Sequence, residues 1–330
     1  MPGGIPRITN ETLAETREEV LKGAKKFIYP LQHSKHRVVL LSSLIGLAAL
    51  LVFFSYSLLA LYRYKSTNTF IYRVTQVVPF PIARVGGRFV PYEEYLFEMR
   101  QYMHYFQTQE KLDFSKPENK SQLENQRKEA LKTVINREYI KRLARQNKIT
   151  VSASEIDAEI ANLESQNRLG SDNTTLKDVI RDYYGWTIND FRRSIADKLL
   201  AVKVLDKLDT ETRARAEQAL SELKAGKDFA EVAKAYSDDA GTKANGGDIA
   251  GLIDKQDRNF PAQMTAELYK LQPGQYSGIF NIGYALEIVK NVEVKDGKIH
   301  AAYILFNYKD LQSFINAEQA KVPAQQFVRF

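Results

Sequence analysis

Residues Leu286 to Phe306 read LEIVKNVEVKDGKIHAAYILF, and this stretch decides the fold. Apolar residues alternate with polar ones on both sides of Asp296-Gly297. Asp-Gly between two such runs is the strongest short-range signal for a β-hairpin. The sequence therefore predicts two antiparallel strands, Leu286–Val294 and Lys298–Phe306, joined by a tight turn.

The residues just upstream predict helices that would pack on this hairpin. Glu211–Lys224 has the pattern of a helix, and Gly226 follows it as a C-terminal stop signal. Asp228 is placed to cap a second helix, which leads into a polar, Gly-rich turn at Ser237–Gly247. We expect residues 209–306 to form one compact α+β unit.

The region before this unit, residues 77–208, is predominantly helical in its periodicity. Ile82–Val85 predicts a short strand, with a turn at Gly86-Gly87 and a return strand after it. Helical spacing follows in four segments: Tyr92–Gln107, and those that carry Leu131/Ile135/Tyr139/Leu143, Ile156/Ile160/Leu163 and Phe191/Ile195/Leu199/Val202. Capping boxes begin the last two segments, at Ser152/Glu155 and Thr187/Asp190. Asn167–Asn173 predicts a loop.

An uncharged run at residues 38–62, Val38 to Tyr62, lies near the N-terminus. About 25 residues of helix span roughly 37 Å, which exceeds the ~30 Å hydrocarbon core of a bilayer. A cleaved signal peptide would have a shorter apolar region and a small-residue cleavage site, whereas Arg63 follows here. A buried helix of a soluble protein is the other alternative, and an uncharged run of this length disfavours it. We expect a retained transmembrane helix.

Basic residues flank this run on both sides, with a slight excess before it. Those before the run are Lys25, Lys26, Lys35 and Arg37, and those after it are Arg63, Lys65 and Arg73. The positive-inside rule then places residues 1–37 in the cytoplasm as a short tail. The large C-terminal body is expected outside the cytoplasm. Thr12–Phe27 predicts an amphipathic helix that either lies on the membrane surface or is solvated.

The composition excludes several classes of function. The net charge of +7 comes from 47 Lys+Arg and 40 Asp+Glu without one dominant cluster, so we expect no nucleic-acid partner. The chain has no Cys, which excludes disulfides, thiolate metal sites and Cys nucleophiles. The sequence shows no metal-ligand cluster, phosphate loop or Ser/His/Asp arrangement. We therefore expect no cofactor.

Several short motifs in the C-terminal half occur in a fixed order. They are Gly226-Lys-Asp-Phe229-Ala, Tyr236-Ser-Asp-Asp239, Asn245-Gly-Gly-Asp248-Ile249, Phe260, Leu271-Gln-Pro-Gly274-Gln-Tyr-Ser277 and Ile282-Gly283-Tyr284. This series resembles a parvulin-type (PpiC, rotamase) peptidyl-prolyl cis-trans isomerase domain. The upstream region is similar to the N-terminal chaperone region of SurA/PrsA-type foldases, through Pro81–Gly87 and Tyr184–Phe191. The resemblance covers roughly residues 77–306.

The resemblance implies an α+β fold with a four-stranded antiparallel sheet, but the first strand of that sheet is missing from its usual place. A parvulin domain begins with a strand that carries a His, whereas Ala201–Leu208 reads here as the end of a helix. We expect the strand at Lys298–Phe306 to take that place, so that the domain is permuted at one strand. The alternatives are an additional edge strand or the opening of a truncated second domain. Residues 307–330 would then form a C-terminal helix and tail.

The resemblance also implies a set of site residues for prolyl isomerisation. The X–Pro bond rotates over a barrier of roughly 18–20 kcal/mol without bond cleavage, so a catalyst needs only to bind the twisted amide best. The family's Cys/Asp position falls on Asp239, its first-strand His on Tyr303 and its last-strand His on Ala285. The predicted catalytic residues are Asp239 and Tyr303. The predicted substrate-binding residues are Ile249, Leu252, Gln256 and Phe260.

Three departures qualify this assignment. Both family His positions are replaced, which predicts weak or absent isomerase activity. His300 lies three residues from Tyr303, so in a regular strand it faces the opposite side of the sheet. Asp239 has an alternative role, because it can brace the Ser237–Gly247 turn.

Two functions follow from these observations. The first is a parvulin-class isomerase at a bacterial inner membrane that acts on unfolded or newly exported polypeptides. The second is a holdase that binds such chains without catalysis, with exposed aromatic residues of the Tyr92–Gln107 helix as contacts, unless these residues form core. The expected partners are client polypeptides and the lipid bilayer. A purely structural membrane protein would explain neither the motif series nor its pocket positions.

Overall fold

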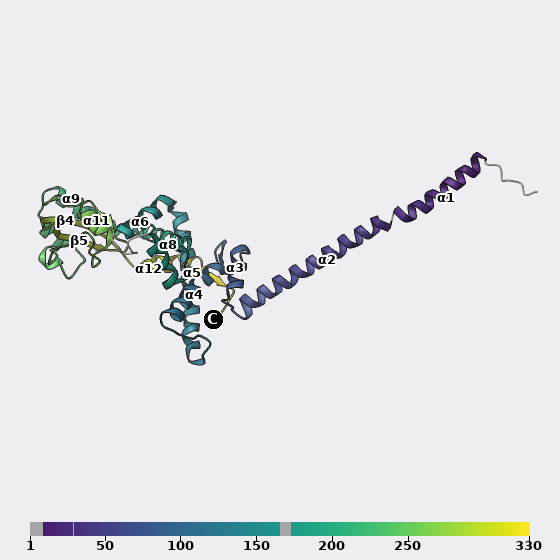
Figure 1. Cartoon of the computed structure of the whole chain (residues 1–330). Helices are drawn as coiled ribbons and strands as arrows, with labels where there is room; N and C mark the ends of the chain where they lie inside the picture. The colour runs from purple at the N-terminus through teal and green to yellow at the C-terminus, as the bar shows by residue number, and fades with distance from the viewer. Residues whose placement is uncertain (1–8, 29, 166–172) are drawn as a thin grey trace, which may run out of the picture. The chain divides into compact units, whose positions relative to one another are not determined.

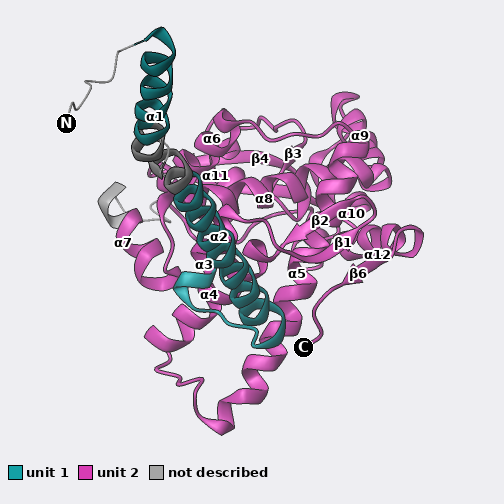
Figure 2. Ribbon diagram, turned by 90° about the vertical axis from the view of Figure 1, so that its right-hand side faces the viewer, with its two compact units in different colours: residues 1–71 teal, residues 72–330 magenta. Residues whose placement is uncertain are grey.

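A computed structural model describes residues 9–28, 30–165 and 173–330 of the chain, which divides into two compact units, Met1–Ile71 and Tyr72–Phe330 (Figure 2). The first unit contains α1 (Asn10–Ile28) and α2 (Pro30–Leu58), followed by a π-helical turn at Leu59–Arg63 (Figure 1). The stretch from His36 to Arg63 is long and apolar enough to cross a membrane. The predicted apolar helix is therefore present, and its insertion in a bilayer stays a prediction.

The second unit opens with a β-hairpin and a series of helices. Helix α3 leads into it and spans Thr69–Val77. The elements that follow are β1 (Pro81–Val85), β2 (Arg88–Pro91), α4 (Tyr92–Thr108), a 3-10 turn at Pro117–Asn119, α5 (Lys120–Gln146), α6 (Ala153–Ser165), α7 (Asn173–Tyr184) and α8 (Ile188–Leu208). Most of the predicted loop at 167–173 lies outside the described residues. Asn173 instead begins α7, a helix that the periodicity analysis did not predict.

Helix starts and buried faces in this region follow from local sequence. Thr187 and Asp190 form the predicted capping box of α8, with each side chain accepting a hydrogen bond from the other residue's N–H at 2.9 and 3.2 Å. The four-residue repeat of α5 faces the interior, because its apolar members are buried. In α4, Tyr95 and Phe97 are buried core residues, so they offer no exposed surface to a client.

The rest of the second unit contains the predicted α+β elements. They are α9 (Thr210–Lys224), α10 (Phe229–Tyr236), a 3-10 turn at Lys243–Asn245, α11 (Ala262–Leu268), β3 (Phe280–Asn281), β4 (Ala285–Lys295) and β5 (Lys298–Asn307). Strands β4 and β5 form the expected hairpin. Its turn residues, Asp296 and Gly297, have φ of 51° and 74°, as the tight Asp-Gly turn requires.

Strand β5 occupies an interior position in the sheet. On one side it pairs with β4 along its whole length, and β4 in turn pairs with β3. On the other side it meets residues 247–253 through isolated antiparallel bridges, and the N–H of Tyr303 donates to the oxygen of Gly247 at 2.9 Å. The 247–253 segment thus takes the fourth strand position, and it pairs with β5 through isolated bridges instead of a continuous ladder. Strand β5 therefore lies between β4 and the 247–253 segment, which is the place that the permuted arrangement predicts.

The two faces of this sheet pack against different helices. One face presents Leu286, Ile288 and Ile304 to helices α9 and α10. The opposite face presents Val289, Ala301 and Ile299 to α11 and the 247–253 segment. Because side chains alternate along a strand, the second face also carries Tyr303 and Glu287. Of the predicted site residues, Ile249, Phe260 and Tyr303 gather on this second face.

The last residues of the chain return to the helical region. Helix α12 (Leu311–Lys321) packs on α5, and β6 (Ala324–Gln326) pairs antiparallel with β1. The buried Tyr139 of α5 fixes this return, because its hydroxyl donates to the oxygen of Val322 at 2.6 Å. The first and last segments of the second unit therefore pack together.

Candidate functional site

Asp239 and Tyr303 are in direct contact. The hydroxyl of Tyr303, on β5, donates to Oδ2 of Asp239 at 2.6 Å. The loop that carries Asp239 is fastened to the same strand, because the N–H of Asp238 donates to the oxygen of Leu305 at 2.7 Å. The permuted strand thus brings two residues, 64 positions apart in the sequence, into one polar pair.

Asp239 also braces its own loop, as the alternative interpretation expected. The N–H of Thr242 donates to Asp239 Oδ2 at 2.9 Å, and the Thr242 hydroxyl donates to the same oxygen. Burial opposes ionisation of this carboxyl, but the hydrogen bonds from Thr242 and Tyr303 outweigh burial and keep its pKa below the ordinary value. The two roles are therefore compatible: a carboxylate held by the turn accepts a hydrogen bond from the Tyr303 hydroxyl.

Tyr303 keeps its proton over the physiological range. Burial is the main reason that its pKa is raised well above the ordinary value, and the hydrogen bond to Asp239 adds to the effect. Its phenol therefore acts as a fixed hydrogen-bond donor to Asp239. A His at this position would instead titrate near neutral pH.

The predicted substrate-binding residues fall into two groups. Ile249 is buried in the cluster formed by Met264 and Val289, and Phe260 and Tyr303 pack against that cluster. These residues form an apolar surface beside the Asp239–Tyr303 pair. Leu252 is 39% exposed, and Gln256 is also exposed, because both lie on the 250–259 segment at the surface. The structure does not bring these two residues into the cluster.

The carboxyl group of Glu287 was missed by the sequence analysis. Glu287 lies on β4, opposite Leu305 of β5, and is only 1% exposed. Burial, with a smaller contribution from the charge of Asp239, raises its pKa to about 8. Its Oε2 atom has no hydrogen-bond partner in the described parts of the chain. At neutral pH the site therefore holds a buried, protonated carboxylic acid.

A sequence signal for Glu287 did exist. Ala285, Glu287 and Val289 alternate with apolar residues in β4, so the sheet period places this acid on the face that carries the site. An acidic residue at an inward position of a core strand is unusual unless it is paired or functional.

Tyr303 stands at the family's first-strand His position, and Ala285 stands at its last-strand His position. Ala285 is fully buried and offers only a methyl group, so this end of the site has lost a polar side chain. His300 faces away from Tyr303, as predicted, and its Nε2 lies 2.8 Å from Asp248 Oδ1. His300 therefore does not replace the missing groups.

Family models match two successive regions of the chain. The profile of the SurA-like N-terminal domain matches residues 31–205, and that of the PPIC-type PPIase domain matches residues 199–293. The permuted strand β5 lies just beyond the second match. The N-terminal match covers more than half of the chain.

The curated relatives include proteins named SurA and PrsA. The chain is 29% identical to a chaperone SurA from Methylobacillus flagellatus over 52% of its length, and 32% identical to a foldase protein PrsA from Geobacillus over 34%. It is 27% identical over 59% of its length to a protein from Bacillus subtilis named putative peptidyl-prolyl cis-trans isomerase YacD. The matches span 36%, 38% and 65% of those relatives. The chain belongs to the family of foldases in which a SurA-like N-terminal domain is joined to a PPIC-type peptidyl-prolyl isomerase domain.

Proposed function

We propose that this protein is a membrane-anchored folding factor that binds unfolded, proline-containing segments of exported polypeptides and isomerises their X–Pro bonds. The observation that carries the catalytic part is the hydrogen bond from Tyr303 to Asp239 beside the apolar surface of Ile249 and Phe260. The apolar residues can hold a proline ring. In this proposal the polar pair would contact the adjoining amide as it twists.

Glu287 adds a donor to this arrangement. A protonated carboxylic acid in a dry site can donate a hydrogen bond, which a carboxylate cannot do. Glu287 is only 1% exposed, so the residues that cover it would have to move before a substrate carbonyl accepted this hydrogen bond. Such a donor favours isomerisation only if it binds the twisted amide better than the planar one.

A second candidate function is that of a holdase without turnover. The observation that favours it is the loss of both His positions, with the methyl group of Ala285 at one of them. Binding of unfolded chains needs no polar cluster, so this function survives the loss. The two candidates differ in one measurable property, which is catalysis of proline-limited refolding.

We expect the full chain in detergent to accelerate proline-limited refolding of a model protein. Tyr303→Phe should lower the catalytic efficiency roughly 10- to 100-fold, because a hydrogen bond to a carboxylate contributes roughly 1.5–3 kcal/mol. Phe260→Ala should reduce it at least as far by removing the apolar surface. Tyr276→Phe is the matched control, because Tyr276 packs in the cluster on the opposite face of the sheet.

Each outcome of that assay decides between the candidates. Acceleration that Phe260→Ala abolishes supports the isomerase. Suppressed aggregation of an unfolded client without any acceleration supports the holdase. A chain that does neither would refute the proposed function.

The proposed membrane topology has a separate test, because the chain contains no Cys. A single Cys is introduced by Lys295→Cys in the β4–β5 turn region or by Glu15→Cys in α1. In intact bacterial cells whose outer envelope is permeabilised, a membrane-impermeant maleimide should label the first variant and not the second. The reverse pattern would place the body in the cytoplasm.

A further inference from the structure

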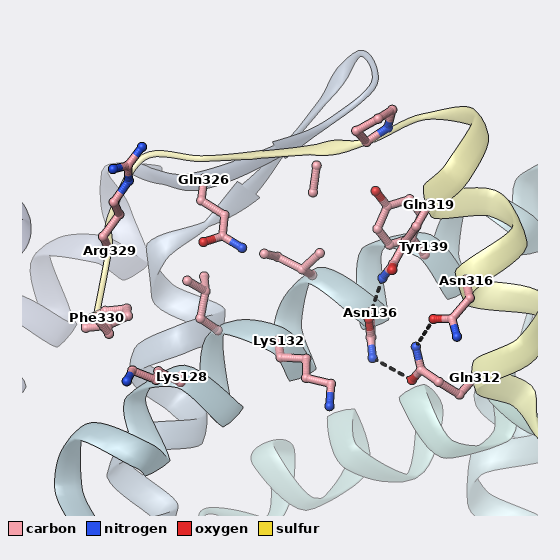
Figure 3. Close-up of a pocket in the computed structure, with 14 residues that line it drawn as sticks. Lys128, Lys132, Asn136, Tyr139, Gln312, Asn316, Gln319, Gln326, Arg329 and Phe330 are labelled. Carbon is pink, nitrogen blue, oxygen red and sulfur yellow. Dashed lines mark hydrogen bonds between the residues drawn. The ribbon is translucent and has the colours of Figure 1, made fainter. Parts of the chain in front are cut away.

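A cavity of about 730 Å³ lies between α5 and the C-terminal segment, away from the Tyr303 site (Figure 3). One stripe of α5 forms its floor, and α12 forms one side. The chain that follows α12 crosses over it, through β6 to Phe330. The apolar part of the lining includes Leu131, Ile135 and Phe330.

A row of side-chain amides lines the α12 side of this cavity (Figure 3). Gln319 donates to Asn136 at 3.0 Å, Asn136 donates to Gln312 at 2.9 Å, and Gln312 donates to Asn316 at 2.8 Å. Each amide carries two N–H donors and an acceptor oxygen, so the row retains hydrogen-bonding capacity after these bonds. The remaining donors and acceptors of this row can hydrogen-bond the N–H and C=O groups of a peptide main chain.

The charged residues that line the cavity all have the same sign. Lys128, Lys132 and Arg329 contribute positive charge, and none of the described lining residues is Asp or Glu. Figure 3 shows Lys128 and Arg329 at the end of the cavity near Phe330, with the amides at the other end. Lys132 pairs with its own helix neighbour Glu129 at 3.9 Å, and both side chains are exposed. A lining whose charges are all positive favours an anionic ligand.

We propose that this cavity binds an acidic, extended segment of a client polypeptide. The amide row would hold the main chain, and Lys128 and Lys132 would attract Asp or Glu side chains. This inference rests on the proposed binding of unfolded polypeptides and adds a preference for acidic segments. It also separates the binding of clients from the prolyl site, which lies on a different sheet.

The test measures binding of labelled extended peptides to the full chain in detergent. One peptide contains several Glu residues, and two otherwise identical peptides carry Gln or Lys in their place. We expect the Glu peptide to bind about tenfold more tightly than the Gln peptide, since a few exposed ion pairs give an effect of this size. High salt should remove the difference.

Charge reversal locates the site. In the double variant Lys128→Glu/Lys132→Glu, the Glu peptide should lose its advantage and the Lys peptide should gain it. The control is Lys224→Glu/Lys255→Glu, which makes the same charge change at exposed positions outside the cavity. Gln312→Met/Gln319→Met should weaken all three peptides alike, because it removes contacts to the main chain.

The outcomes separate this inference from the function on which it rests. Equal binding of the Glu and Gln peptides overturns the acidic preference and leaves client binding intact. A preference that survives Lys128→Glu/Lys132→Glu places the site elsewhere and also overturns the inference. If no peptide binds and the chain suppresses no aggregation, the client-binding function itself fails.

Discussion

Gly247→Ala should detach the 247–253 segment from β5 and open the site. A Cβ at this position would lie 2.2 Å from the main-chain oxygen of Tyr303, a distance at which the backbone must move. Gly247 also has a φ of 81°, which an L-residue adopts only with strain. Strain and overpacking together should cost about 2–5 kcal/mol of local stability.

Hydrogen exchange at the Tyr303 amide measures this effect directly. That N–H donates to the oxygen of Gly247, so it loses its acceptor when the segment moves away. Gly274→Ala is the matched control, because Gly274 has a φ of 84° but no atom within 4 Å of the position that a Cβ would take. It should show the backbone strain alone, roughly 1–2 kcal/mol. Equal effects of the two substitutions would contradict the close approach as the cause.

The elements that the sequence predicted are those with local signals. The Asp296-Gly297 turn and the Thr187/Asp190 capping box each depend on a few neighbouring residues, and both occur where they were expected. The position of β5 within the sheet was predicted from the parvulin resemblance together with the tight Asp296-Gly297 hairpin. A tight hairpin leaves its second strand few places other than beside the first.

The elements that the sequence did not predict depend on distant contacts. Strand β6 has three residues and no apolar alternation, and it exists only because β1 lies beside it. The exposure of Leu252 and Gln256 is set by the path of the 250–259 segment, which a position-by-position transfer from a family cannot supply. The contact of Gly247 with Tyr303 likewise joins residues far apart in the chain.

Glu287 shows why the site itself was only partly predictable. The strand period gives the face on which this acid lies, but its burial depends on the loop and helix that cover the sheet. Without that cover the carboxyl would be solvated and ionised at neutral pH, like most acidic residues. Its protonation is a property of the tertiary structure.

Glu287→Gln should make the protein more stable at alkaline pH. The pKa of Glu287 is about 8 in the folded chain, against an ordinary value of 4.5. Between these two values the folded state binds a proton that the unfolded state has lost, so stability falls as pH rises. The slope for one such group is about 1.4 kcal/mol per pH unit, and the sum over the interval is about 5 kcal/mol. Glutamine has a similar shape and no proton to lose.

The measurement is denaturant unfolding of the full chain in detergent from about pH 5 to pH 9, with the C-terminal unit followed by hydrogen exchange of β4 and β5. Wild type should lose stability up to about pH 8 and then level off, and Glu287→Gln should remain nearly flat. Glu217→Gln is the control, because Glu217 is exposed on α9 and its substitution should leave the slope unchanged. Asp239 does not confuse the result: its pKa is lowered, so its contribution is lost only in acid. Parallel pH profiles for wild type and Glu287→Gln would mean that the buried acid is ionised, and Glu287 could not then serve as a hydrogen-bond donor beside Asp239 and Tyr303.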